Sequence, residues 1–168
     1  VYAAKDLKCP GSGAKGVFPA LEYLTASNRK NFGDDVPAYD DGTLNADGKR
    51  VVVIGGGDTA MDCVRTAIRQ GAKSVSCVYR RDRANMPGSQ REVTNAEEEG
   101  VTFEWLASPD AILDTKAGKL KAVRASRMKL GEPDASGRQS PVKTGETFDI
   151  KADMVIKALG FDPEDLPE

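Results

Sequence analysis

The hydrophobic and polar positions along the chain separate short apolar runs from amphipathic stretches. The residues of Arg50–Ile54 after the arginine are all β-branched and apolar, and a second mostly apolar run fills Ser74–Tyr79; both have the length of a buried strand. Residues 58–70 lie between them, and Gly71 is a plausible end for a helix there. The apolar residues of this stretch form one helical stripe: Ala60, Met61, Val64, Ala67 and Ile68. The order predicts a strand–helix–strand unit with parallel strands.

Helices are also expected on both sides of this unit. Residues 1–16 read as irregular chain, Pro19 is expected to open a short helix to Asn28, and residues 31–49 read as a polar connecting loop. Ser89 begins a capping-box pattern, which predicts a helix from Gln90 to near Gly100.

The second half of the chain favours strands. Residues 101–106 read as a third strand, and residues 120–130 and 146–150 as paired strands on either side of a long polar turn at 131–145. Residues 152–159 read as a last core strand that ends at a glycine. We therefore predict an α/β fold: a Rossmann-like parallel sheet with helices, in which a β-meander replaces one crossover helix.

The junction of the first strand and its helix carries a dinucleotide fingerprint, Gly55-x-Gly57-x-x-Ala60. Gly55 allows a sharp turn, Gly57 leaves room for a pyrophosphate, and Ala60 lets the helix lie close to the sheet. The helix amides then face the phosphates, and Thr59 adds a hydroxyl donor. The Asp58 carboxylate repels a pyrophosphate, so it is expected to cap the helix or to accept from a ribose or an amide of the ligand. The alternative is a tight strand–helix turn without a ligand.

Positive charge follows the second strand at Arg80 and Arg81, with Arg83 close enough to assist. Sites selective for NAD carry an acidic residue here for the ribose 2′-hydroxyl, whereas a guanidinium offers a planar fork to a 2′-phosphate. We therefore predict NADP(H) in preference to NAD(H). Two alternatives stay open because of Asp82: a solvated charged turn, and an NAD-type site in which that carboxylate contacts a ribose.

The turn after the last core strand is a further candidate for contact with the ligand. In open parallel sheets, ligands bind beyond the carboxyl ends of the strands, near the point where the strand order reverses. We expect Ala158 and Gly160 to face the glycine turn, close to the nicotinamide. The alternative is an ordinary strand end.

Composition narrows the chemistry. The chain has 24 basic and 26 acidic residues, so no basic field indicates nucleic acid, and no apolar run approaches the length of a membrane helix. It contains no histidine, which removes the commonest general base and metal ligand; we predict no catalytic side chain and no metal site. Cys9, Cys63 and Cys77 form no CxxC pair and are expected to be apolar fillers in a reducing cytoplasm. Phe103 and Trp105 are expected to pack in the core or at an edge.

Longer motifs carry a resemblance to a known family. These motifs are GGGDTAMD, YRRD and NMPGSQRE, together with GVFPALEYLTASNR before them and ADMVIKALGFDPED after them. With them the chain resembles the small (beta) subunit of bacterial NADPH-dependent glutamate synthase and, more distantly, the matching part of dihydropyrimidine dehydrogenase. The resemblance implies the NADPH-binding insert of a two-dinucleotide flavoprotein. Residues 49–160 would form that domain, 1–48 would lead in from a missing FAD domain, and 161–168 would return to it.

The resemblance also implies contacts and partners. The family's NADPH contacts fall on Gly56, Gly57, Asp58 and Thr59, on the arginines at 80 and 81, and on the turn at 158–160. NADPH would reduce FAD in the same subunit, and iron–sulfur clusters would pass electrons to the large (alpha) subunit, where glutamate is made. The chain has neither a second glycine fingerprint near its start nor a cysteine cluster, so it is expected to bind NADPH without turnover.

Two other functions stay open from the sequence. One is a non-catalytic module that docks domains or subunits through the apolar side of the leading helix, Leu21, Tyr23 and Leu24. The other is a free-standing short dehydrogenase, against which the lack of histidine and of a Tyr-x-x-x-Lys pair argues.

Overall fold

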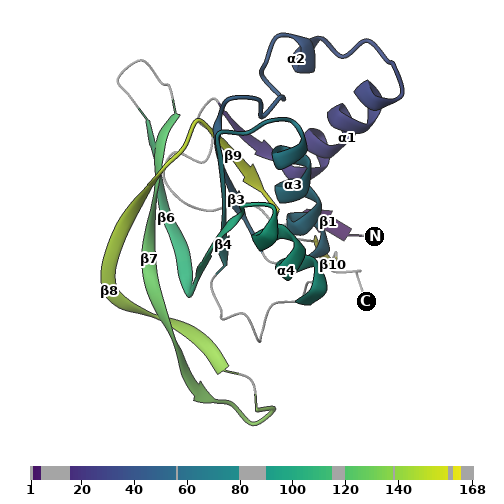
Figure 1. Cartoon of the computed structure of the whole chain (residues 1–168). Coiled ribbons are helices and arrows are strands. Elements are labelled where there is room, and N and C mark those ends of the chain that lie inside the picture. The colour runs from purple at the N-terminus through teal and green to yellow at the C-terminus, as the bar shows by residue number, and fades with distance from the viewer. Residues whose placement is uncertain are drawn as a thin grey trace.

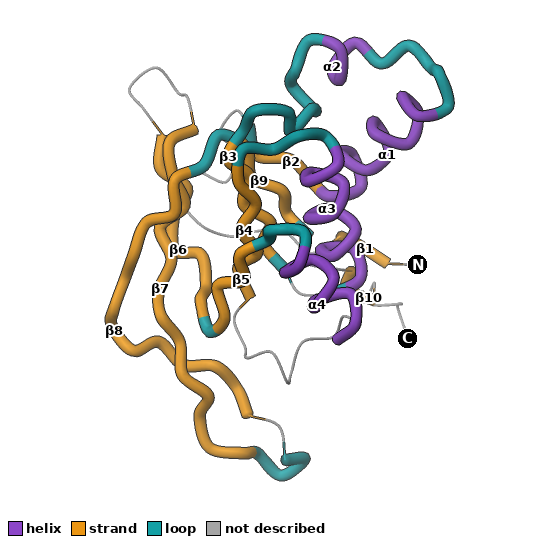
Figure 2. Tube along the Cα trace, viewed as in Figure 1, coloured by secondary structure: helices purple, strands orange, loops and turns teal. Residues whose placement is uncertain are grey.

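The chain forms three layers (Figure 1). The computed structural model describes residues 2–4, 16–55, 57–79, 90–114, 120–137, 139–158 and 161–163. Helices cover one face of a parallel sheet, and an antiparallel sheet covers the other, as the colouring in Figure 2 makes plain. The predicted α/β class is confirmed.

The central layer consists, within the described residues, of five parallel strands in the order β2-β9-β3-β4-β5. Their bounds are β2 Val17–Pro19, β3 Arg50–Ile54, β4 Ser74–Tyr79, β5 Thr102–Trp105 and β9 Met154–Lys157. The residues of β3 after Arg50 are all buried, as an apolar β-branched run in the middle of a covered parallel sheet should be. The strand order reverses at β3, since β4 and β5 lie on one side of it and the later β9 on the other.

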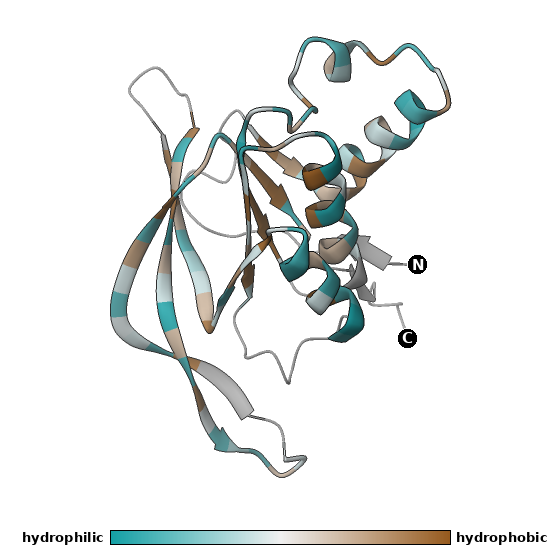
Figure 3. Cartoon of the chain, in the orientation of Figure 1, coloured by the Kyte–Doolittle hydropathy of each residue, from teal (hydrophilic) through white to brown (hydrophobic). Residues whose placement is uncertain are grey.

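The helical layer is built around α3 (Asp58–Arg69). Its stripe is buried as predicted: Ala60, Met61, Val64 and Ala67 are fully buried against the sheet, and Ile68 packs at the margin. Gly71 follows the helix with a φ of +91°, the left-handed conformation that favours glycine after a helix. The helices α1 (Ala20–Asn31) and α4 (Gln90–Glu98) pack on either side of α3. Figure 3 shows the apolar strands enclosed between the layers.

The third layer is an antiparallel meander on the opposite face of the sheet. Its strands are β6 Ala107–Asp114, β7 Leu120–Pro133 and β8 Gln139–Lys151, in the order β6-β7-β8. Ile112, Leu120 and Val123 pack with Val52 and Val155 of the parallel sheet in a second core cluster. The predicted β-meander is therefore confirmed, and β7 with β8 extends past the end of β6 as a two-stranded arm (Figure 1).

Two sequence predictions about loops are wrong. The polar turn predicted at 131–145 is mostly strand, because β7 runs to Pro133 and β8 starts at Gln139. That part of the arm has no apolar side to bury, so the alternation that signals a strand is missing. The loop predicted at 31–49 contains the short helix α2, Pro37–Asp40, with proline at its first position.

The start of the chain is also more regular than predicted. Pro19 ends β2, and α1 begins one residue later and runs to Asn31 instead of Asn28. Residues 2–4 form β1, which pairs antiparallel with β10 (Phe161–Pro163). Three-residue strands whose partners lie about the whole chain away leave no periodic signal in sequence. Whether 49–160 is a separate domain stays a prediction, although β2 and α1 join the same sheet and core.

Candidate nucleotide-binding site

The glycine turn between β3 and α3 is held by the neighbouring strand β4. Gly55 has a φ of +138°, a conformation that L-residues with a side chain rarely adopt. Its N–H donates to the carbonyl of Val78 at 3.1 Å. Its own carbonyl accepts from the thiol of Cys77 at 3.2 Å. The sharp turn predicted at Gly55 is therefore present, and both of its backbone polar groups are tied to β4.

Gly57 stands at the start of α3 with open space in front of it. It is the N-cap residue with an extended backbone, and its carbonyl accepts the first helical hydrogen bond from the N–H of Met61 at 3.2 Å. A Cβ placed on Gly57 meets no heavy atom within 4 Å among the described residues. The first N–H groups of a helix lack partners within it, and those of α3 follow directly after Gly57, beside the half-buried Thr59. Room and donors for a phosphate therefore coincide.

Ala158 lies on the other side of the same turn. It is buried, and its N–H donates to the carbonyl of Ile54 at 2.8 Å, which extends the pairing of β9 with β3 by one residue. The carboxyl ends of β3 and β9 thus meet where the strand order reverses. The structure brings together Gly55, Gly57, Thr59 and Ala158 at this edge, the position at which open parallel sheets bind ligands.

The other predicted site residues lie outside the described part of the chain. They are Gly56, Arg80, Arg81 and Gly160, with Asp82 and Arg83 beside the arginine pair. The backbone of Asp58 begins α3, but its side chain is outside the described atoms. Tyr79, the residue before the arginine pair, ends β4 at the same edge as the glycine turn. The roles of these residues stay predictions.

The two described cysteines are buried free thiols, as predicted for apolar fillers. Burial raises the pKa of Cys77 to about 12. Burial, with smaller contributions from the charges of Asp62 and Cys77, raises the pKa of Cys63 to about 12. Both thiols are therefore neutral at ordinary pH. Sequence reasoning missed the bond from Cys77 to Gly55, because nothing in a strand pattern shows which carbonyl a buried thiol meets.

Metal-binding and membrane-spanning features are absent from the part of the chain that the structure describes. No three of its cysteine, aspartate and glutamate side chains form a group able to hold a metal ion. None of its helices has both the length and the apolar character needed to cross a bilayer.

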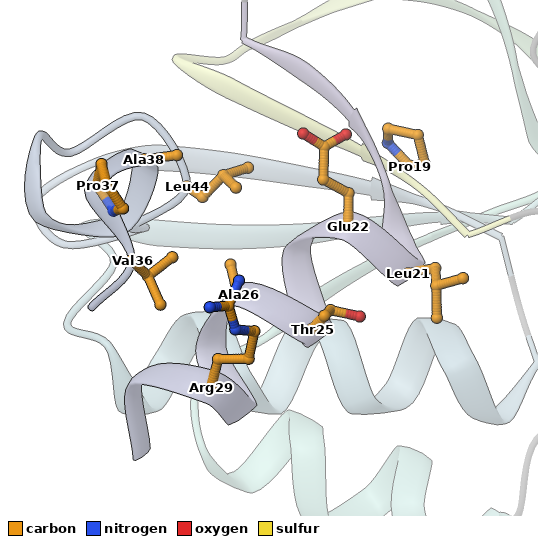
Figure 4. A pocket seen from close by; sticks show the side chains of 10 residues that line it. All are labelled: Pro19, Leu21, Glu22, Thr25, Ala26, Arg29, Val36, Pro37, Ala38 and Leu44. Atoms are coloured by element: carbon orange, nitrogen blue, oxygen red, sulfur yellow. The ribbon is translucent and has the colours of Figure 1, made fainter. Parts of the chain in front are cut away.

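A groove of about 590 Å³ lies between α1 and α2 (Figure 4). Its lining is mainly apolar, with Glu22 and Arg29 as its charged members, and none of the predicted site residues lines it. Of the three apolar residues expected to dock a partner, Leu21 is 65% exposed, whereas Tyr23 is fully buried and Leu24 packs against the main core. Most of that apolar side of the helix is therefore used within the chain.

An open parallel sheet with a glycine turn at its point of reversal defines a dinucleotide-binding α/β domain. The sequence matches the pyridine nucleotide-disulphide oxidoreductase family over residues 3–167, and the chain belongs to this family.

Curated relatives share most of this sequence. The chain is 62% identical over 168 residues to the glutamate synthase [NADPH] small chain of Azospirillum brasilense, covering 99% of this chain and 34% of that protein. It is 63% identical to a putative glutamate synthase [NADPH] small chain of Cereibacter sphaeroides, with 99% and 40% covered. The chain thus spans about a third of the length of these relatives.

A solved structure shares the fold. Mycobacterium tuberculosis FprA in complex with NADPH superposes with a TM-score of 0.75 at 18% identity, over 98% of this chain and 49% of that one. At this identity the likeness establishes the arrangement of the elements.

Proposed function

We propose that this chain is the NADPH-binding domain of a flavin-dependent oxidoreductase. The observation that carries the proposal is the glycine turn at the carboxyl ends of β3 and β9, with open space in front of Gly57. A pyrophosphate fits there, because bare main chain permits close approach and the start of α3 supplies N–H donors and a partial positive charge. Membership of the pyridine nucleotide-disulphide oxidoreductase family supports the same ligand class.

The residues of the chain bind and orient the nucleotide. Gly55 to Thr59 hold the diphosphate, and the turn from Ala158 to Gly160 lies at the nicotinamide end. Arg80 and Arg81 follow β4 in the sequence and, in this proposal, hold the 2′-phosphate through charge-assisted hydrogen bonds. NADPH supplies a hydride when it is bound, and the chain contributes position, since it contains no histidine and no catalytic side chain is assigned.

The complete protein is proposed to be the small subunit of an NADPH-dependent glutamate synthase in the cytoplasm. The relatives are named as glutamate synthase [NADPH] small chains, one of them as putative, and this chain covers 34% and 40% of their lengths. In the proposal, FAD and iron–sulfur clusters belong to the rest of the subunit, the large subunit makes glutamate, and this domain alone binds NADPH without turnover. The pairing of residues 2–4 with 161–163 supports an insert that is entered and left at one place.

Isothermal titration with NADPH and NADH tests the proposal. We expect NADPH to bind at least about ten-fold more tightly, because a lost phosphate–arginine pair costs at least about 1.4 kcal/mol. The double variant Arg80→Ala/Arg81→Ala should bring the two affinities together. Arg124→Ala is the matched control, since Arg124 is exposed and pairs with Asp149 on the antiparallel sheet.

The outcomes separate the parts of the proposal. Equal affinities for the two nucleotides in the unaltered chain contradict the assignment of the arginine pair. Failure of both nucleotides to bind contradicts the proposed function itself.

A further inference from the structure

Two aromatic residues stand at the carboxyl ends of β4 and β5. Tyr79 and Trp105 are register partners, their ring centroids are 6.4 Å apart, and their planes meet at 83°. Both side chains are half-buried. Because all strands of this sheet are parallel, the pair lies at the same edge as the glycine turn. It therefore borders the proposed nucleotide site on the side of β4 and β5.

The indole of Trp105 packs against the main core cluster, and Phe103 of the same strand covers one of its two ring faces. Phe103 stacks on it with a centroid distance of 5.0 Å and an interplanar angle of 8°. Since Phe103 comes two residues earlier in a strand that runs toward the site, it covers the face directed back along the strand. The opposite face is directed toward the carboxyl edge. A planar ring bound beyond that edge would continue the stack.

The turn after Trp105 has a strained backbone and is held in position by a hydrogen bond from β7. Leu106 has a φ of +54°, a conformation that is costly for a residue with a branched side chain and that clusters at functional sites. Its carbonyl accepts from the N–H of Met128 at 2.6 Å, so β7 holds this turn. The end of β5 is thereby pinned at the edge where the aromatic pair stands.

The spacing of the strands matches the two ends of an adenosine diphosphate group. The glycine turn follows β3 and Trp105 ends β5, with β4 between them, so they are separated by two strand spacings, about 10 Å. This is the scale of a ribose with its base. The residue that follows Tyr79 is Arg80, one of the pair assigned to the 2′-phosphate of that ribose.

We propose that Trp105 is the stacking platform for the adenine of NADPH, with Tyr79 closing the side of the pocket. The inference rests on the proposed function and adds to it Tyr79 and Trp105; Trp105 was expected only to pack, and it does pack against the main core. Aromatic platforms suit a purine because stacking needs a flat π-face and no particular hydrogen bond.

Trp105 is the only tryptophan in the chain, so its fluorescence reports this position alone. We expect adenosine 2′,5′-bisphosphate to quench the tryptophan emission of the 168-residue chain, with the same midpoint as its calorimetric binding. Nicotinamide mononucleotide, which lacks the adenosine, should leave the emission unchanged. Calorimetric binding of the bisphosphate without any change in emission would overturn the platform.

Variants separate stacking from structural packing. Trp105→Leu should weaken binding of the bisphosphate about five-fold or more, and Trp105→Phe should restore most of the loss. Phe148→Leu is the control, because it removes a ring that packs with the second core cluster on the antiparallel sheet, away from the aromatic pair, and should leave the affinity unchanged. Equal weakening by Phe148→Leu and Trp105→Leu would overturn the proposal. If Trp105→Leu does not fold, the emission of the unaltered chain decides.

The same experiments distinguish the two levels of inference. If NADPH binds but the tryptophan emission does not change, the assignment of Trp105 as the adenine platform is wrong, and the proposed function is unaffected. Absence of any NADPH binding in calorimetry removes the proposed function.

Discussion

Glycines at either end of α3 serve different purposes. Gly57, at the start, has a φ of −89°, which any residue adopts, and a Cβ there meets open space. Gly71, past the end, has a φ of +91°, and a Cβ there would lie 2.8 Å from the carboxylate of Asp47. The fold therefore requires glycine at 71 but not at 57, which leaves ligand approach as the reason for Gly57.

Gly57→Val should abolish NADPH binding while leaving the fold intact, because the new side chain occupies the space proposed for the pyrophosphate. We expect the affinity to fall at least about ten-fold, whereas the poorer N-cap should lower the melting temperature by only about 2–4 °C. Calorimetry and thermal unfolding measure the two effects.

Gly71→Val is the control with the opposite profile. It should lower the free energy of unfolding by about 1–2 kcal/mol, because valine is strained at positive φ and crowds Asp47, while NADPH affinity is kept. Normal NADPH binding by Gly57→Val would show that the pyrophosphate lies elsewhere.

At the scale of elements, α3 and β4 meet through buried thiols. Cys63 lies on α3 and Cys77 on β4, and both belong to the main core cluster. Their pKa values rise from 9.0 to about 12 because burial opposes the charged thiolate. Both thiols therefore keep their protons in the folded chain at neutral pH.

Stability should fall as the pH rises above 9. Between pH 9 and 12 the unfolded chain loses these two protons while the folded chain retains them. The stabilisation is therefore complete below pH 9 and is lost through this window. Each thiol adds a slope of up to about 1.4 kcal/mol per pH unit. Urea unfolding across this range measures the slope.

The double variant Cys63→Ala/Cys77→Ala serves as the comparison for that slope. It will be less stable at neutral pH, because cavities replace the sulfur atoms. Its free energy of unfolding should decline less steeply above pH 9. Identical slopes in the variant and the unaltered chain would contradict the assignment of the alkaline loss to these thiols.

Sequence patterns predicted the elements whose burial leaves a local mark in the sequence. The helix α3 buries one face and shows a stripe of apolar residues, whereas β3 is buried on both faces and shows an unbroken apolar run. The arm at 131–145 and the three-residue β2 were missed. The described side chains of the arm are nearly all exposed, and Val17 of β2 pairs with Val155 far along the chain. Sequence patterns reveal periodicity within one segment, but they do not reveal which distant segment a strand pairs with.

The candidate site was predicted to a similar extent. The fingerprint placed Gly55 and Gly57 at a strand–helix turn, and the structure has that turn. Ala158 was expected opposite the turn, and its bond to Ile54 puts it there. The aromatic pair Tyr79 and Trp105 was not foreseen as part of the site, because only strand register shows that two residues far apart in sequence end side by side.

At the scale of the whole molecule, the proposed ligand site and the groove are lined by different residues. The glycine turn, Ala158 and the aromatic pair gather at the carboxyl ends of β9, β3, β4 and β5, whereas the groove lies between α1 and α2 (Figures 1 and 4). If the chain binds a nucleotide, the ligand should affect the glycine turn. If the chain is a docking module, a partner should affect the groove between α1 and α2. This separation allows one experiment to decide between them.

That experiment is an amide NMR titration of the chain with NADPH. The proposed site predicts the largest shift changes at Gly55, Gly57, Thr59 and Ala158, with small changes along the groove between α1 and α2. Shift changes concentrated on Ala26, Val36 and Leu44 in that groove, with the glycine turn unmoved, would contradict the site and the function assigned to it.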